Sequence, residues 1–208
     1  MPHATVDDGV KLYFEETGSG KLVVFVHEFA ANNQSWELQM RHFGRRYRCA
    51  AFAARGYPPS DVPERPSSYS QHRAADDIAA IIKHLGESKG HIVGLSMGGF
   101  AALHFGFRHP NKAHSLCIGG CGYGAELNQR ERFRGEAEAI ASIIKTEGLM
   151  LLRRAMSLVR HAFNFRTRIR AALPNSGNCW HGIRRSAPPI RSLVFRRSGP
   201  RSTSSSIR

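Results

Sequence analysis

The stretch Gly94-Leu95-Ser96-Met97-Gly98 decides the fold of this 208-residue chain. An apolar, β-branched run precedes it and a run rich in Ala and Phe follows it, which predicts a buried strand, a sharp turn and a helix. A serine on so tight a turn is forced into a strained backbone conformation, and the flanking glycines prevent Cβ clashes between strand and helix. The serine hydroxyl is then expected at the carboxyl end of a sheet and at a helix N-terminus, whose dipole favours developing negative charge.

Strand and helix signals alternate on both sides of this turn. Short apolar runs predict strands, and apolar residues recurring at three- and four-residue spacing predict helices. This alternation predicts an α/β fold with a mostly parallel sheet and helices on both faces. In the last helix we expect Ile140, Ile143 and Ile144 to face inward. The predicted strands are Val10–Glu15, Leu22–Val26, Cys49–Ala54, His91–Leu95 and Ala113–Ile118, and the predicted helices are Asn33–Phe43, Ser70–Leu85, Gly98–Arg108 and Glu126–Thr146.

The formal net charge of +14 is concentrated in one part of the chain. Residues 1–148 carry 17 Lys and Arg against 16 Asp and Glu, whereas residues 149–208 carry 13 Arg and no Lys, Asp or Glu. The overall basicity therefore does not make the first part of the chain a nucleic-acid binder. The basic part has no sustained helical or strand period.

The sequence predicts neither a metal centre nor a membrane protein. Its four cysteines, Cys49, Cys117, Cys121 and Cys179, form no Cys-x-x-Cys pair and no zinc-type ladder with histidine. The N-terminus has no signal-peptide pattern, and the longest strongly apolar run, Leu22–Val26, is too short to cross a bilayer. We therefore expect a cytoplasmic protein with no cofactor, no metal and no membrane span.

Further motifs accompany the serine turn in a recognisable order. They are His27-Glu28-Phe29-Ala30 directly after a predicted strand, Arg55-Gly56 before a proline-containing loop with Asp61, and Arg108-His109-Pro110 after the helix. With these motifs the chain resembles the α/β-hydrolase family, which includes esterases, lipases, epoxide hydrolases and carbon–carbon hydrolases, and Gly-x-Ser-x-Gly matches its nucleophile elbow. The resemblance covers residues 1 to about 148 and implies the α/β-hydrolase fold. The alternative interpretation of the serine turn alone is an ordinary glycine-rich connection.

The resemblance implies roles for five residues. Ser96 matches the nucleophile, the backbone N–H groups of Phe29 and Met97 match the oxyanion hole, and Gly94 and Gly98 match the elbow glycines. A serine in place of an aspartate at the elbow disfavours the epoxide-hydrolase and dehalogenase branches. The implied function is a serine hydrolase acting on a small apolar ester, lactone or related carbonyl compound.

Two positions depart from the family pattern. Glu28 stands where a glycine usually follows the histidine, and Ala53 stands where an aspartate usually precedes the Arg-Gly motif. We expect Glu28 to be a solvated loop charge, because carboxylates are rarely buried. The alternative is that Glu28 alters the mouth of the pocket.

The catalytic acid and histidine that the serine requires cannot be assigned. The family order is Ser, then Asp or Glu, then His, yet the last aspartate, Asp77, precedes the serine. The later acids all belong to the last predicted helical stretch, and the first three later histidines are interpreted as surface or packing residues. We also expect the last strands of the sheet to be missing, with an open edge beside Ala113–Ile118. The later acids are Glu126, Glu131, Glu136, Glu138 and Glu147, and the later histidines are His104, His109, His114, His161 and His181.

These observations divide the chain into a hydrolase core (1–125), the start of a helical cap (126–148) and an Arg-rich tail (149–208). Without the acid and the histidine we expect little or no turnover of a small-molecule substrate. One alternative is a non-catalytic, hydrolase-like binding module. Another is a tail that binds nucleic acid or other anions non-specifically, since nothing predicts specific readout. The sequence leaves the oligomeric state open.

The composition of the tail is typical of a GC-rich gene read out of frame, and we expect the tail to be out of frame or disordered. The hypothesis places a frameshift near residues 145–155. Reading the coding DNA beyond codon 140 in all three frames tests it. We expect an open shifted frame that encodes two further strands with an Asp and a His. An intact coding sequence with no such frame would show that the tail is genuine.

Overall fold

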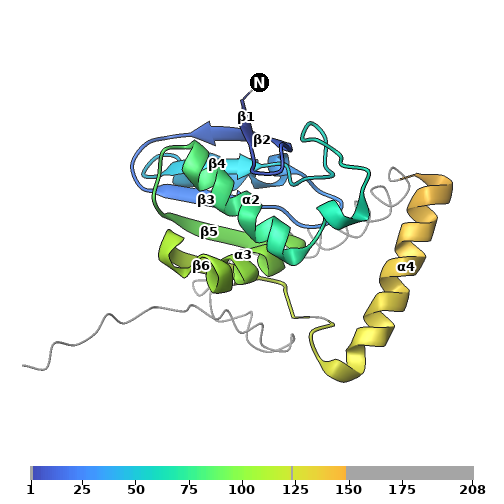
Figure 1. Cartoon of the computed structure of the whole chain (residues 1–208). Coiled ribbons are helices and arrows are strands. Elements are labelled where there is room, and N and C mark those ends of the chain that lie inside the picture. Colours follow the sequence, from blue (N-terminus) through green and yellow to red (C-terminus); the bar gives the residue numbers. More distant parts are fainter. Residues whose placement is uncertain (1, 123, 149–208) are drawn as a thin grey trace, which may run out of the picture.

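The computed structural model describes residues 2–122 and 124–148 (Figure 1). The strands are β1 (His3–Thr5), β2 (Lys11–Thr17), β3 (Leu22–Val26), β4 (Arg48–Phe52), β5 (Gly90–Leu95) and β6 (Ala113–Gly119). The α-helices are α1 (Glu37–Phe43), α2 (Gln71–His84), α3 (Met97–Arg108) and α4 (Arg130–Glu147). Short 3-10 turns are η1 (Asn33–Trp36), η2 (Pro66–Ser68), η3 (Pro110–Lys112) and η4 (Leu127–Gln129). The proposed tail, with His161 and His181, lies outside the described residues.

The sheet is mostly parallel, as the sequence predicts. Its strand order is β1-β2-β4-β3-β5-β6. Strand β3 pairs in parallel with β4 and β5, and β5 pairs in parallel with β6, whereas β1 and β2 run antiparallel to their neighbours. All five residues of β3 are buried, which explains its unbroken apolar sequence. Strand β1 was not predicted, because three residues are too few to show an apolar alternation.

Helices cover both faces of the sheet, which confirms the second part of the prediction. Helices α2 and α3 pack side by side on one face (Figure 1), where Ile81 and Phe105 join a core with Val24. Helix α1 covers the other face, where Met40 packs with Phe25. Successive residues of β3 therefore serve two different cores, as the alternation of side chains along a strand requires.

Helix α2 begins and ends where the sequence predicts. The Ser70 hydroxyl caps its N-terminus by accepting a hydrogen bond from the backbone N–H of Arg73 at 3.0 Å. Gly86 follows its C-terminus with a φ of +77°, a conformation that suits glycine. Ile78 and Ile82 are buried on the side that meets the sheet and α3. The helix is thus fixed at both ends and along one face.

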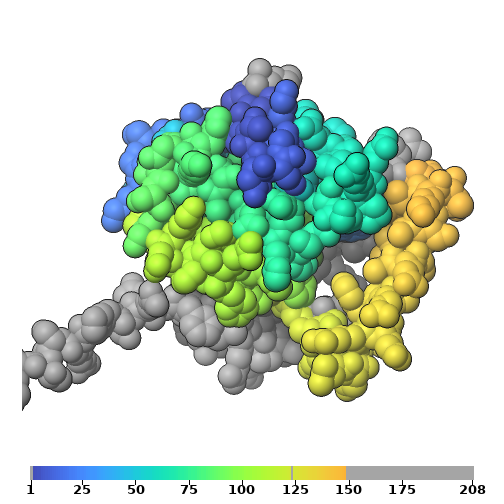
Figure 2. All heavy atoms as spheres, in the orientation of Figure 1, coloured from blue at the N-terminus to red at the C-terminus, as the bar shows by residue number. Residues whose placement is uncertain are grey.

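Helix α4 differs from its prediction. Ile140 is 36% exposed and Ile143 is 42% exposed, so the expectation that these two face inward is wrong within the described residues, while Ile144 is half-buried. Figures 1 and 2 show α4 at the side of the sheet, apart from the helices that cover its two faces. The spacing of the isoleucines correctly predicted a helix, but periodicity alone does not identify what a helix packs against. The division into a core and a helical cap remains a prediction.

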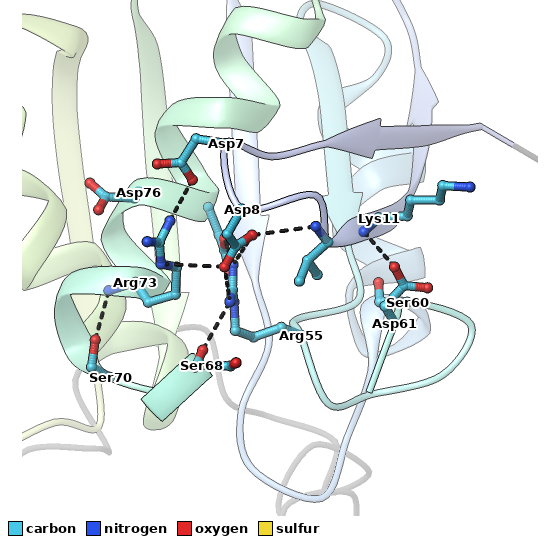
Figure 3. A network of polar contacts seen from close by, with 12 residues as sticks. Asp7, Asp8, Lys11, Arg55, Ser60, Asp61, Ser68, Ser70, Arg73 and Asp76 are labelled. Carbon is cyan, nitrogen blue, oxygen red and sulfur yellow. Dashed lines mark hydrogen bonds and ion pairs between the residues drawn. The ribbon is translucent and has the colours of Figure 1, made fainter. Parts of the chain in front are cut away.

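A buried ion-pair network ties the loop after β4 to α2 and to the N-terminal turn. Arg55 is only 6% exposed, and its guanidinium donates to both carboxylate oxygens of Asp77, at 2.7 and 2.6 Å. It also donates to Asp8 at 2.8 Å and to the backbone carbonyl of Ser68 at 2.9 Å (Figure 3). The guanidinium thereby joins the loop after β4 to the N-terminal turn, to η2 and to α2.

Arg73 extends the network to the surface. It pairs with Asp7 and lies 3.6 Å from a carboxylate oxygen of Asp8 (Figure 3). The hydrogen bond from Arg55 holds the pKa of Asp8 below its usual value, so this carboxylate stays charged at neutral pH. The network therefore runs from a buried pair to an exposed one.

We expect Asp77→Asn to lower the free energy of unfolding by about 3–5 kcal/mol, because it leaves the buried Arg55 charge without its closest partner. Asp7→Asn is the matched control: the side chain of Asp7 is 72% exposed, and its loss should cost less than about 1 kcal/mol. Chemical denaturation of the full chain and both variants measures the difference. Equal losses in the two variants would contradict the assigned role of the Arg55–Asp77 pair.

Candidate active site

Ser96 lies on the turn between β5 and α3. Its backbone has φ 52° and ψ −115°, which confirms the strained conformation predicted from the sequence. Its N–H donates to the carbonyl oxygen of Gly119 at 2.8 Å, and its own carbonyl accepts from the N–H of Phe100 at 3.0 Å. The side chain is half-buried at the carboxyl end of the sheet. The turn is therefore held between the end of β6 and the first turn of α3.

The glycines beside Ser96 are required by close backbone contacts. A Cβ atom on Gly94 would lie 2.1 Å from the carbonyl oxygen of Gly98. A Cβ atom on Gly98 would lie 2.2 Å from the carbonyl oxygen of Val26, the last residue of β3. Because real Cβ atoms do not approach so closely, both positions exclude any side chain. The contact at Gly98 brings the start of α3 directly against the end of β3.

The residues that follow β3, which we call the 27–30 loop, are fixed by a buried histidine. Nε2 of His27 accepts a hydrogen bond from the backbone N–H of Ala54 at 3.0 Å, and Nδ1 lies 2.8 Å from the carbonyl oxygen of Glu28. Nδ1 therefore carries the proton and donates it to that carbonyl. Burial lowers the pKa of His27 to about 4, so the ring is neutral at physiological pH. From the sequence alone, this histidine only marks the end of the strand, and its anchoring role is not predicted.

The buried state of Glu28 corrects a prediction. Glu28 is only 8% exposed, so its interpretation as a solvated loop charge is wrong. Its carboxylate accepts a hydrogen bond from the Ser35 hydroxyl at 3.3 Å. The chain turns back at Asn32, whose side chain caps η1, and this turn brings Ser35 over Glu28. The sequence around Glu28 gave no sign of this turn.

A pocket of about 700 Å³, here called the elbow pocket, opens beside the turn. Its walls include Phe29 and Met97, the two residues predicted to supply oxyanion N–H groups. Tyr57, Val62 and Tyr69 add apolar surface to the pocket wall. Arg55 and Asp77 also line the pocket, but their side chains are almost completely shielded from solvent. Ser96 is not among the described residues that line this pocket, but the next residue, Met97, is. Tyr57 was not among the residues predicted for the site, although it directly follows the Arg55-Gly56 motif.

The described residues place no base beside Ser96. The one close Asp–His contact, between Asp76 and Nε2 of His109 at 2.7 Å, lies at the opposite end of α3. A helix of this length separates its two ends by about 18 Å. Burial alone would raise the pKa of Asp76, but hydrogen bonds from Arg108 and His109 lower it. This pair therefore stabilises the α2–α3 contact and is too distant to accept a proton from Ser96.

The other histidines close to the elbow in sequence also lie elsewhere. The His104 ring lies tilted to that of His72 and edge-on to that of Phe107, and His114 lies beside His91. In residues 2–122 and 124–148 no group of three His, Cys, Asp or Glu side chains could hold a metal ion. Within the same residues, no helix combines the length and the apolar character needed to cross a bilayer.

Comparison with known proteins gives one family. Residues 21–135 match the family model described as alpha/beta hydrolase fold. Epoxide hydrolase 1 of Caenorhabditis elegans is 34% identical over 109 residues, which are 51% of this chain and 27% of that protein. A non-heme haloperoxidase of Rhodococcus erythropolis is 30% identical over 110 residues, or 52% of this chain and 39% of that protein. The match thus spans roughly a third of the length of these curated relatives.

Solved structures resemble the same part of the chain. An epoxide hydrolase from Vigna radiata has a TM-score of 0.52 at 32% identity, covering 55% of this chain and 37% of that one. An esterase from Exiguobacterium antarcticum has a TM-score of 0.51 at 34% identity, covering 55% of this chain and 42% of that one. A Bacillus megaterium epoxide hydrolase variant aligns over 74% of this chain with a TM-score of 0.64, but at 23% identity this supports the fold alone.

We expect stability to fall as the pH drops from about 6.5 towards 4, because His27 takes up a proton only after unfolding in this range. The pKa difference corresponds to a loss of up to about 3 kcal/mol. Denaturant unfolding at a series of pH values measures it. In His27→Gln this component should be absent, which separates it from other groups such as His91. An unchanged slope in the variant would contradict the buried, neutral state of His27.

Proposed function

The chain belongs to the α/β-hydrolase fold family, and we propose that it carries the nucleophile of a serine hydrolase for small apolar esters, lactones or related carbonyl compounds. The observation that carries the proposal is Ser96 at a positive φ between β5 and α3. A hydroxyl held in this way stands clear of its own backbone at a helix N-terminus, as nucleophilic attack requires. The apolar walls of the elbow pocket support an apolar substrate.

In the proposed reaction Oγ of Ser96 forms a bond to the carbonyl carbon, and the electron pair of the C=O bond moves to the oxygen. The backbone N–H groups of Phe29 and Met97 stabilise this oxyanion. When the C=O bond re-forms, the ester C–O bond breaks, and the leaving oxygen takes up the proton given up by Ser96 and departs as an alcohol. The acyl-serine that remains is then hydrolysed by water. The serine proton needs a base, and none of the described residues supplies one. We therefore propose little or no turnover by this chain alone.

The choice between carbonyl compounds and epoxides rests on the chemistry of the intermediate. Several relatives bear the name epoxide hydrolase, but they are compared with this chain over only part of their length. Attack of Ser96 on an epoxide carbon would open the ring and leave a serine ether, which water does not cleave readily. Attack on an ester leaves an acyl-serine, which water does cleave. A serine at the elbow therefore favours the carbonyl substrates.

A non-catalytic binding module is the second candidate. The observation that favours it is the combination of an apolar pocket with a serine that has no base beside it among the described residues. In that case the elbow pocket would retain a small apolar ligand without cleaving it. The experiment below separates the two candidates.

We expect a tagged fluorophosphonate, with imidazole as an external base, to add covalently to the full chain at Ser96. Intact-mass and peptide mass spectrometry detect the adduct. The adduct should be absent from Ser96→Ala and unchanged in Ser115→Ala. Ser115 is the matched control, because its hydroxyl lies 2.8 Å from Nδ1 of His91 and is the rival activated serine of the described residues.

Two results would contradict the proposed nucleophile. One is an adduct that persists in Ser96→Ala and disappears in Ser115→Ala. The other is an unlabelled full chain that still binds an apolar probe such as naphthol, which would favour the binding module. Without imidazole, full chain and Ser96→Ala should hydrolyse 4-nitrophenyl acetate at equal rates. A faster, Ser96-dependent rate would contradict the proposed absence of turnover.

A further inference from the structure

Tyr57 stands between the two segments that the proposed function assigns to the oxyanion. It lies on the loop after β4, and its ring lines the elbow pocket with Phe29 and Met97. The ring packs edge-on against the buried ring of His27, with centroids 4.8 Å apart. A third segment of the chain thus reaches between the 27–30 loop and the start of α3.

The hydroxyl of Tyr57 contacts both of these segments. It donates to Sδ of Met97 at 3.7 Å, and it also faces the backbone N–H of Ala30, which partly offsets the effect of burial on the pKa of the hydroxyl. Burial raises the pKa of Tyr57, so the hydroxyl keeps its proton at neutral pH and can donate. One hydroxyl group therefore bridges the residue after Phe29 and the side chain of Met97.

The contact with Ala30 falls at a strained point of the loop. Ala30 has a φ of 58°, a conformation that alanine adopts only when its surroundings require it. His27 anchors the start of the 27–30 loop through Ala54, and Tyr57 packs its ring on His27 and places its hydroxyl at the Ala30 N–H. The Phe29 N–H lies between these two anchors.

We propose that Tyr57 is a positioning residue that sets the spacing between the backbone N–H groups of Phe29 and Met97. Oxyanion stabilisation depends on donors placed within a few tenths of an ångström of their best positions. A residue that touches both donor segments controls that spacing without touching the substrate oxygen itself. The inference rests on the proposed function for its catalytic consequence, whereas its effect on the loop stands independently.

The test compares the full chain with Tyr57→Phe, which removes the hydroxyl and keeps the ring. Tyr13→Phe is the matched control, because it removes a hydroxyl that bonds to Glu15 on β2, and neither residue lines the pocket. The first measurement is amide hydrogen exchange at Ala30 by NMR. Loss of the hydroxyl that faces the Ala30 N–H should speed this exchange by about 3- to 10-fold in Tyr57→Phe, with no change in Tyr13→Phe.

The second measurement is acylation of Ser96 by 4-nitrophenyl acetate in imidazole buffer. Tyr57→Phe should lower the limiting rate by about 3- to 10-fold and leave half-saturation unchanged, because only the transition-state oxyanion senses the donor spacing. A merely structural role would change half-saturation or folding instead. Tyr13→Phe should match the parent chain.

The two measurements distinguish the inference from the proposed function. Unchanged Ala30 exchange in Tyr57→Phe would overturn the inference, whatever the acylation rate. Faster Ala30 exchange with an unchanged limiting rate would overturn the catalytic part. If the parent chain is not acylated at Ser96, the proposed function fails, and faster exchange at Ala30 would still support Tyr57 as the residue that holds the loop.

Discussion

The close approach of β3 to α3 is the contact on which the candidate site depends. At Gly98 the backbone leaves no room for a Cβ atom beside the carbonyl oxygens of Val26 and His27. This contact brings the residues after β3 and the residues after β5 to one place, so Phe29 and Met97 share a pocket despite their separation in the sequence. The parallel pairing of Val26 with Gly94 sets the register that makes the approach possible.

Polar contacts of different kinds then hold the loops around that approach. His27 works as a neutral connector between the 27–30 loop and the end of β4, and burial keeps it neutral. Arg55 works as a charged connector, whose position depends on the buried carboxylate of Asp77. Both connectors come from residues that a sequence motif marks without revealing their partners. These two contacts therefore hold the pocket wall around Ala54 and Arg55 in place.

Much of the fold was predictable because its signals are local. The apolar run of β3, the capped period of α2 and the Gly-x-Ser-x-Gly turn each specify their own backbone conformation. The burial of Glu28 was not predictable, because it depends on the turn at Asn32 that brings Ser35 to its carboxylate. The exposure of Ile143 was not predictable either, because periodicity does not identify what a helix packs against. The contact of Tyr57 with Met97 joins residues that are distant in the sequence. For the candidate site, the position of the turn could therefore be predicted from the sequence, whereas the contacts that hold the neighbouring loops could be identified only from the structure.

The close approach of β3 to α3 is tested most directly by comparing the unfolding free energy of Gly98→Ala with that of Gly135→Ala. We expect Gly98→Ala to lose more than about 3 kcal/mol of unfolding free energy or to fail to fold, because its Cβ would lie 2.2 Å from the carbonyl oxygen of Val26. Gly135 lies in α4 with open space around it, so Gly135→Ala should gain about 0.5–1 kcal/mol. A Gly98→Ala chain as stable as its parent would contradict the close contact of β3 with α3 at Gly98.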